Sequence, residues 1–211
     1  MKVSHEFPIP YMVQGRELID YDFCLPHLLD SSNEYFNYFL ESKKLKRYII
    51  MDNSLHELGK PYDSERLWYW MNALKPNEFI VPDYWQDKTA TLVAAKSWLQ
   101  KDFPKKTTPM AVVQASSKSE ARECYTILKM QGYQKIAFSW YKDMPFIESI
   151  DTSNPVIHGL AGIKYEEYGL LDKLPHKVDK FEGDSDNWEI VLYNVNKFKE
   201  FIPKKTKEYA S

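Results

Sequence analysis

The most constraining feature of this sequence is a series of short apolar runs, each of which ends in a polar residue at a regular spacing. The runs are rich in β-branched and aromatic residues, which is typical of buried strands. The intervals between their polar ends are 25 residues (His27 to Asp52), 31 (Asp52 to Asp83), 31 (Asp83 to Gln114) and 25 (Gln114 to Ser139). Each interval has about the length of a strand, a helix and the next strand. The sequence therefore predicts an α/β fold with a parallel sheet. The five clearest runs are Tyr21–Leu29, Arg47–Ser54, Glu78–Trp85, Met110–Ala115 and Lys135–Trp140.

Helix-like segments separate these runs. Ser64–Leu74 begins with a residue that we expect to cap a helix, and it carries an apolar stripe of Leu67, Trp70, Met71 and Leu74. Thr89–Phe103 and Ser117–Met130 have the same pattern, and the second places Cys124 on its core face. Further along the chain, the sequence predicts strands at 146–151 and 155–162 and helices at 164–174 and 185–201. The last helix would bury a stripe that contains Trp188, Val191 and Val195.

Two architectures place all the strand-end residues at one edge of a parallel sheet. In a (β/α)8 barrel they surround one mouth, whereas in an open doubly wound sheet they lie along a line. We favour a compact (β/α)8, TIM-barrel-like fold in one domain, residues 1–211. Because about 250 residues is usual for eight full units, some helices must be shortened or missing.

Charge and cysteine content narrow the possible partners. The formal net charge is −2, and only four of the 28 basic residues are Arg, so any nucleic acid would be held by local lysine patches rather than by overall charge. The candidate patches are Lys43 to Arg47, Lys105-Lys106 and the tail from Lys197 to Lys207, and each taken alone is more typical of solvated surface. No apolar run approaches the roughly 20 residues that span a bilayer. Two cysteines and five scattered histidines indicate no metal site and favour a reducing cytoplasm.

Three carboxylates stand out because each follows an apolar strand: Asp52, Asp83 and Asp151. A single Asp in such a place is most often a helix cap or a turn residue. Three of them together with Gln114 are more typical of a shared site, in which one carboxylate attacks a sugar carbon and another moves a proton. The third carboxylate and the amide are suited to the donors and acceptors of a purine edge.

At these residues the sequence resembles the tRNA-guanine transglycosylase superfamily, including its phage branch that modifies DNA. Ile49–Glu57 (IIMDNSLHE) resembles the family's ILTDSGGFQ strand, and Leu74–Asp83 (LKPNEFIVPD) resembles its LGSDIVMAFDE segment. Met110–Ser116 (MAVVQAS) resembles FGIVQGG, and Ile136–Trp140 stands where the family has YAVGGLAVGE. Ile150–Pro155 (IDTSNP) resembles FDCVLP, and Pro26-His27-Leu28 is similar to the first-strand YHL of the family.

The resemblance implies a modified (β/α)8 barrel that exchanges guanine for a 7-deazaguanine base without a metal or organic cofactor. Asp151 would be the nucleophile at C1′ of the sugar, and Asp52 would transfer the proton. Asp83 and Gln114 would hold the base, and Trp85 or Trp140 would cover a base taken out of the duplex. The substrate-binding set implied in this way is Asp83, Gln114, Asn53, Ser139, Trp140 and His27.

The departures from the family indicate which nucleic acid is the substrate. The zinc motif of the tRNA enzymes is missing, so we expect DNA rather than tRNA, together with a free purine or 7-deazapurine base. The family's Gly-Gly pairs and the Arg after its Asp-x-x-x-Pro motif are also missing, which keeps two alternatives open. One is a glycosidase or deoxyribosyltransferase that acts on free nucleosides or nucleotides. The other is a non-catalytic barrel that binds a nucleotide, nucleic acid or protein. The oligomeric state is not indicated.

Overall fold

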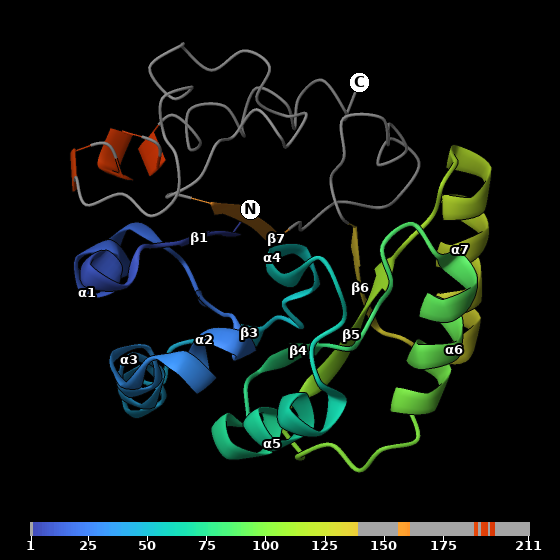
Figure 1. Cartoon of the computed structure of the whole chain (residues 1–211), viewed down its shortest axis with the longest axis horizontal. Helices are drawn as coiled ribbons and strands as arrows, with labels where there is room; N and C mark the ends of the chain where they lie inside the picture. The colour runs from blue at the N-terminus through green and yellow to red at the C-terminus, as the bar shows by residue number, and fades with distance from the viewer. Residues whose placement is uncertain (1, 139–155, 161–187, 190, 194, 197–211) are drawn as a thin grey trace. The chain divides into compact units, whose positions relative to one another are not determined.

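A computed structural model of the chain describes residues 2–138, 156–160, 188–189, 191–193 and 195–196 (Figure 1). The chain divides into two compact units. One contains residues 1–22 and 140–211, and the other contains residues 23–139. None of the described helices combines the length and the apolar character that crossing a membrane requires. The prediction of one domain over residues 1–211 stays a prediction.

A five-stranded parallel sheet organises the larger unit and confirms the α/β class. The strand order is β2-β3-β4-β5-β6, and β3–β4, β4–β5 and β5–β6 pair in parallel. Within the described residues β2 and β6 are the two edges, so this sheet is open and a closed (β/α)8 barrel is not shown. The strands are β2 (Asp22–Cys24), β3 (Ile49–Met51), β4 (Glu78–Ile80), β5 (Thr108–Val113) and β6 (Lys135–Phe138).

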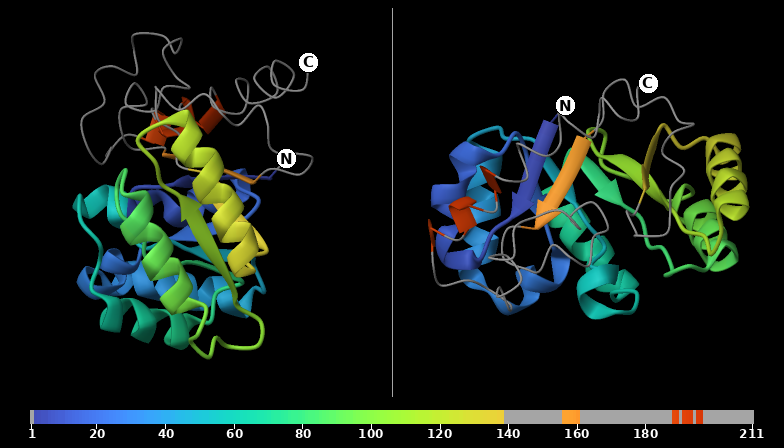
Figure 2. Two further views of the ribbon diagram at one scale, coloured as in Figure 1. Left: turned by 90° about the vertical axis from the view of Figure 1, so that its right-hand side faces the viewer. Right: turned by 90° about the horizontal axis from the view of Figure 1, so that it is seen from above.

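Helices connect the strands, and most of them begin with the side-chain caps that their sequences provide. Ser32, Asp63, Asp87 and Ser117 each accept a hydrogen bond from a backbone N–H of the first turn. The cap of the third of these helices is therefore Asp63, and the prediction of Ser64 was one residue late. Helices α6 and α7 lie side by side (Figure 2). The helices of this unit are α2 (Pro26–Ser31), α3 (Asn33–Lys44), α4 (Leu55–Leu58), α5 (Ser64–Leu74), α6 (Lys88–Trp98) and α7 (Lys118–Gln131).

The core of this unit follows the predicted periodicity. The strands β3 and β4 are buried on both faces, as expected for a parallel sheet covered by helices. The predicted stripe of α5 is buried at all four positions, and Cys124 of α7 is completely buried. The run Tyr21–Leu29 was wrong as one strand, because the chain leaves β2 at Cys24 and begins α2 at Pro26. Proline is favoured in the first helical turn, where it needs no backbone donor.

The smaller unit has its own two-stranded parallel sheet. β1 (Lys2–Glu6) pairs with β7 (Val156–Leu160), which confirms the strand predicted at 155–162. Three short helical turns follow β1: η1 (Ile9–Tyr11), α1 (Met12–Gly15) and η2 (Arg16–Leu18). The described part of 188–196 is helical, as predicted. Its Val191 and Val195 are fully buried in a cluster with Phe7, Tyr11, Leu18 and Trp188.

Candidate functional site

Three of the predicted site residues form one buried hydrogen-bonded network at the carboxyl end of the large sheet. Asn53, Asp83 and Gln114 follow β3, β4 and β5, and they are 4%, 3% and 1% exposed. Asn53 Nδ2 donates to Asp83 Oδ1 at 2.6 Å, and Gln114 Nε2 donates to Asp83 Oδ2 at 2.5 Å. The regular spacing along the chain therefore corresponds to a meeting of three side chains in space.

The two amides are held in one orientation by backbone groups. Asn53 Oδ1 accepts from the N–H of Leu55 at 3.1 Å, and Gln114 Oε1 accepts from the N–H of Gln86 at 3.0 Å. Asn53 Nδ2 also donates to the carbonyl of Val81 at 2.8 Å. Because the oxygen end of each amide is occupied, each NH2 group points at Asp83. The network thus presents the Asp83 carboxylate as an acceptor at both of its oxygens.

The charge of Asp83 has little compensation. Burial raises the pKa of this carboxyl above its ordinary value, and the hydrogen bonds from Gln114 and Asn53 only partly oppose that effect. In the part of the chain that the structure describes, the carboxylate is contacted by amides and not by a cation. A carboxylate has about four lone-pair directions, so each oxygen can still accept a further N–H donor.

Asp52 lies next to this network, and the turn after β3 holds it. The backbone N–H of Ser54 donates to Asp52 Oδ2 at 2.9 Å, while the carboxylate is half-buried. Ser54 is itself fully buried and has a left-handed backbone with φ of 58°. For a residue other than glycine this conformation costs on the order of 1 kcal/mol, and such strain is common at functional turns.

His27 reaches the same turn from another element. The structure places it in the first turn of α2 rather than at a strand end, and its Nδ1 lies 2.8 Å from Ser54 Oγ. Burial lowers the pKa of His27, against the opposing effect of the Asp30 charge. The structure therefore connects His27 to Asp52 through the single residue Ser54.

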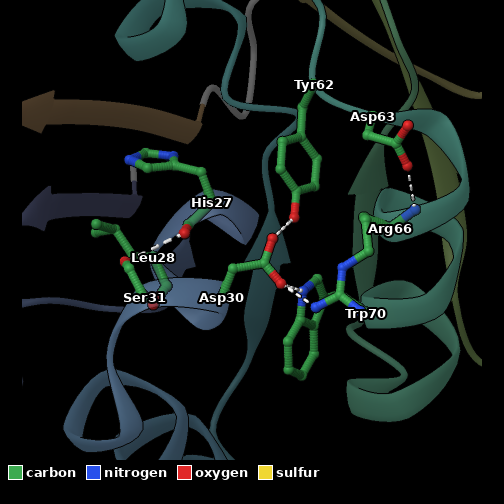
Figure 3. A network of polar contacts seen from close by, with 8 residues as sticks. All are labelled: His27, Leu28, Asp30, Ser31, Tyr62, Asp63, Arg66 and Trp70. Atoms are coloured by element: carbon green, nitrogen blue, oxygen red, sulfur yellow. Dashed lines mark hydrogen bonds and ion pairs between the residues drawn. The ribbon is translucent and has the colours of Figure 1, made fainter.

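A polar cluster anchors α2, and with it His27, against α5. Figure 3 shows Tyr62, Arg66 and Trp70 converging on the carboxylate of Asp30. Trp70 Nε1 donates to Asp30 at 3.0 Å, and the guanidinium of Arg66 also lies over the Trp70 ring, 5.4 Å from its centroid. Burial opposes ionisation of Asp30, but the hydrogen bonds from Arg66, Tyr62 and Trp70 outweigh it and lower the pKa.

Two aromatic rings follow the same strands on the exposed side. Trp85, two residues after Asp83, is 41% exposed and stacks on the ring of His56 with centroids 5.5 Å apart. The sequence singled out Trp85 but missed His56, whose position after a buried Asp-Asn-Ser turn was the available signal. It also missed Gln86, which contributes a backbone N–H and has a φ of 54°.

Three predicted site residues, Ser139, Trp140 and Asp151, lie outside the described residues, and their roles stay predictions. Within residues 2–138 and the shorter described segments, no group of three or more His, Cys, Asp or Glu side chains is arranged to hold a metal ion. No family model matches the chain, and no curated protein matches its sequence. The fold and the site therefore define this protein only as one with a mixed α/β architecture and a polar network at the carboxyl end of a parallel sheet.

Proposed function

We propose that the chain is a base-exchanging transglycosylase that replaces guanine in nucleic acid, with DNA favoured over tRNA, by a 7-deazaguanine base. The proposal includes closure of the fold into a (β/α)8 barrel, a cytoplasmic location and independence from metals and organic cofactors. It extends the resemblance to the tRNA-guanine transglycosylase superfamily to the residues Asp52, Asp83, Gln114 and Asp151.

The observation that carries the proposal is the pairing of Asp83 with Gln114 at the end of neighbouring strands. The edge of guanine presents two N–H donors beside a carbonyl oxygen. An acceptor carboxylate next to a side-chain amide is complementary to that edge. Asp83 also lacks a cation among its described partners, so donors from a bound base would relieve its desolvation. The amide orientations set by Leu55 and Gln86 hold this acceptor in place before a base arrives.

The proposed reaction consists of two displacements at C1′ of the sugar. Asp151 attacks C1′, the bond from C1′ to N9 of guanine breaks, and Asp52 supplies the proton that the leaving base takes up. The incoming base then returns its N9 proton to Asp52 and attacks C1′, and the bond from C1′ to Asp151 breaks. Two inversions retain the configuration of the sugar. In duplex DNA the target base must first leave the stack, and Trp85 is available to cover it.

Labelled guanine in place of the deazaguanine tests the proposal directly, because base exchange is then a measurable incorporation into unlabelled DNA. We expect wild-type protein to incorporate the label, whereas Asp151→Ala and Asp52→Asn should abolish incorporation. Asp83→Asn should weaken it because an acceptor for the base is replaced by a donor. Asp102→Asn, an exposed carboxylate away from the site, is the matched control and should keep full activity.

Parallel reactions with tRNA and with free deoxyguanosine separate the alternatives. Release of guanine without incorporation would favour a glycosidase or deoxyribosyltransferase. No incorporation and no release on any of the three substrates by a folded protein would overturn the enzyme proposal and favour a binding role. In that case Asp52→Asn and Asp151→Asn would leave the biological effect intact.

A further inference from the structure

The amino end of the large sheet gathers lysines from three separate connections of the chain. Each connection leads into a strand, and connections that enter parallel strands lie at the same end of the sheet. The connections before β3, β4 and β5 carry six lysines with exposed side chains. We call this group the amino-end lysine surface. It consists of Lys43, Lys44, Lys46, Lys75, Lys105 and Lys106.

Hydrogen bonds lock the three connections side by side. Asn77 binds both neighbouring segments, because its Oδ1 accepts from the N–H of Ile49 at 2.9 Å and its carbonyl accepts from the N–H of Thr108 at 2.9 Å. Lys43 Nζ donates to the carbonyl of Lys75 at 2.6 Å. Figure 1 shows the chain after α6 running past α5 on its way to β5. The lysines are therefore presented by a fixed set of loops.

The charge of this surface is not balanced locally. Segments 41–48, 75–78 and 99–108 contain eight Lys and Arg residues against three Asp and Glu residues, in a chain whose net charge is −2. One of those acids, Glu78, is buried and bound to Tyr48 at 2.6 Å and Lys135 at 3.1 Å. Burial lowers the pKa of Lys43, and the nearby charges of Lys75 and Lys106 lower it further. Three cations from three connections are thus close enough to repel one another.

Two of the lysines occupy backbone positions where glycine would be less strained. Lys46 has a φ of 56° and Lys75 has a φ of 48°, and Lys75 ends α5 in the left-handed conformation that usually selects Gly or Asn. Lysine there sacrifices stability and keeps a positive charge on the exposed loop. The backbone strain and the charge concentration point the same way.

We propose that the amino-end lysine surface binds the phosphate backbone of DNA, at the opposite end of the sheet from Asp83. Lysine ammonium groups are compact point charges that suit phosphate contacts, and they do not provide the forked geometry that reads base edges. Binding at this surface is therefore independent of sequence and strongly dependent on salt. The choice of DNA as the polyanion rests on the proposed function, whereas the preference for a polyanion rests on the surface itself.

Equilibrium binding of the full-length chain to a fluorescent DNA duplex, with no free base present, tests this proposal. The surface variant combines Lys46→Gln, Lys75→Gln and Lys106→Gln, and it spares Lys43, whose ammonium bonds the backbone. We expect this variant to bind at least about tenfold more weakly than wild type at low salt. Its plot of log affinity against log salt should be shallower by about three, one for each lost phosphate contact.

The matched control removes the same charge from exposed residues of the outer helices. It combines Lys96→Gln, Arg122→Gln and Lys129→Gln, none of which belongs to the three connections. We expect its affinity and salt slope to stay close to those of wild type. Equal losses in the surface and control variants would overturn the proposal, as would the absence of DNA binding by wild type or tighter binding to phosphatidylserine vesicles than to DNA. Circular dichroism and urea unfolding of each variant confirm that binding is compared between folded proteins.

The outcomes also separate this proposal from the proposed function. If wild type exchanges guanine but the surface variant binds DNA like the control, only the surface proposal fails. If the surface variant loses DNA binding but wild type exchanges no base, only the transglycosylase proposal fails.

Discussion

The two ends of the five-stranded sheet use polar residues in opposite ways. At the carboxyl end Asn53, Asp83 and Gln114 are buried, and their hydrogen-bonding groups are aimed at one another. At the amino end the lysines are exposed, and their charges repel. Both ends contain non-glycine residues with left-handed backbones, Ser54 and Gln86 at one end and Lys46 and Lys75 at the other.

The comparison teaches that burial decides how much each polar group matters to the fold. A buried polar group that loses its partner costs about 1–3 kcal/mol, whereas an exposed one is resolvated by water. We therefore expect substitutions at the carboxyl end to affect both stability and function, and neutral substitutions at the amino end to affect chiefly partner binding. The following predictions test this contrast, from the largest expected effect to the smallest.

Asp83→Ala should destabilise the fold by about 2 kcal/mol, because it leaves the buried amide NH2 groups of Asn53 and Gln114 without their acceptor. The free energy of unfolding from urea denaturation measures this loss. Asp102→Ala removes an exposed carboxylate and should change stability by less than about 0.5 kcal/mol. Similar small effects of both substitutions would remove the contrast between the two ends.

Asp30→Ala should cost about 1–2 kcal/mol, since Tyr62, Arg66 and Trp70 lose a shared acceptor that is only partly buried. The pKa of Asp30 is lowered in the folded protein. Its contribution is therefore present above the ordinary pKa of 3.8 and is lost as the pH falls through the lower folded-state pKa. Unfolding free energies measured between neutral and acidic pH should show the wild-type advantage over Asp30→Ala shrinking in acid. An advantage that grew in acid would contradict the assigned direction.

The pH dependence of Asp83 should have the opposite sign. Burial raises its pKa, so the folded protein holds this proton more tightly than the unfolded chain does. The resulting stabilisation is present below 3.8 and is lost as the pH rises through the raised folded-state pKa. Relative to Asp83→Asn, which does not titrate, wild type should become less stable as the pH increases over that range. Chemical denaturation at a series of pH values measures the difference, and a flat difference would show that Asp83 ionises normally.

Glycine substitution at the two left-handed positions should give small effects of opposite sign. Lys75→Gly relieves strain at the end of α5 and should stabilise the fold by about 0.5 kcal/mol after the entropy of the unfolded chain is considered. Ser54→Gly relieves similar strain but removes the hydroxyl that lies 2.8 Å from His27 Nδ1, so it should destabilise by about 0.5–1 kcal/mol. Thermal unfolding of the two variants side by side measures both signs. Stabilisation by both would show that the His27 contact contributes little.

The sequence predicted well wherever local pattern and burial agree. The stripe of α5 and the buried strands β3 and β4 followed from periodicity, because a helix or strand that buries one face must repeat its apolar residues at that period. Prediction failed at Pro26, where a continuous apolar run conceals a change from strand to helix. It also passed over β1, whose partner β7 lies about 150 residues away in the chain.

The candidate site divides in the same way. Spacing was sufficient to select Asp52, Asp83 and Gln114, since parallel strands bring their carboxyl ends to one edge. It did not indicate that Gln114 would donate to Asp83, or that Gln86 would orient that amide through a backbone N–H. Those contacts depend on side-chain rotamers and on a left-handed turn that the amino-acid pattern does not encode.

By itself, the sequence determined the α/β class, the repeating strand–helix units and the carboxylates worth testing, because these depend on residue type and spacing along one chain. Only the tertiary structure decided which polar groups share hydrogen bonds and which lysines from distant segments share one surface. Hydrogen bonds and charge repulsion act over a few ångströms in space, and separation along the chain does not specify that distance.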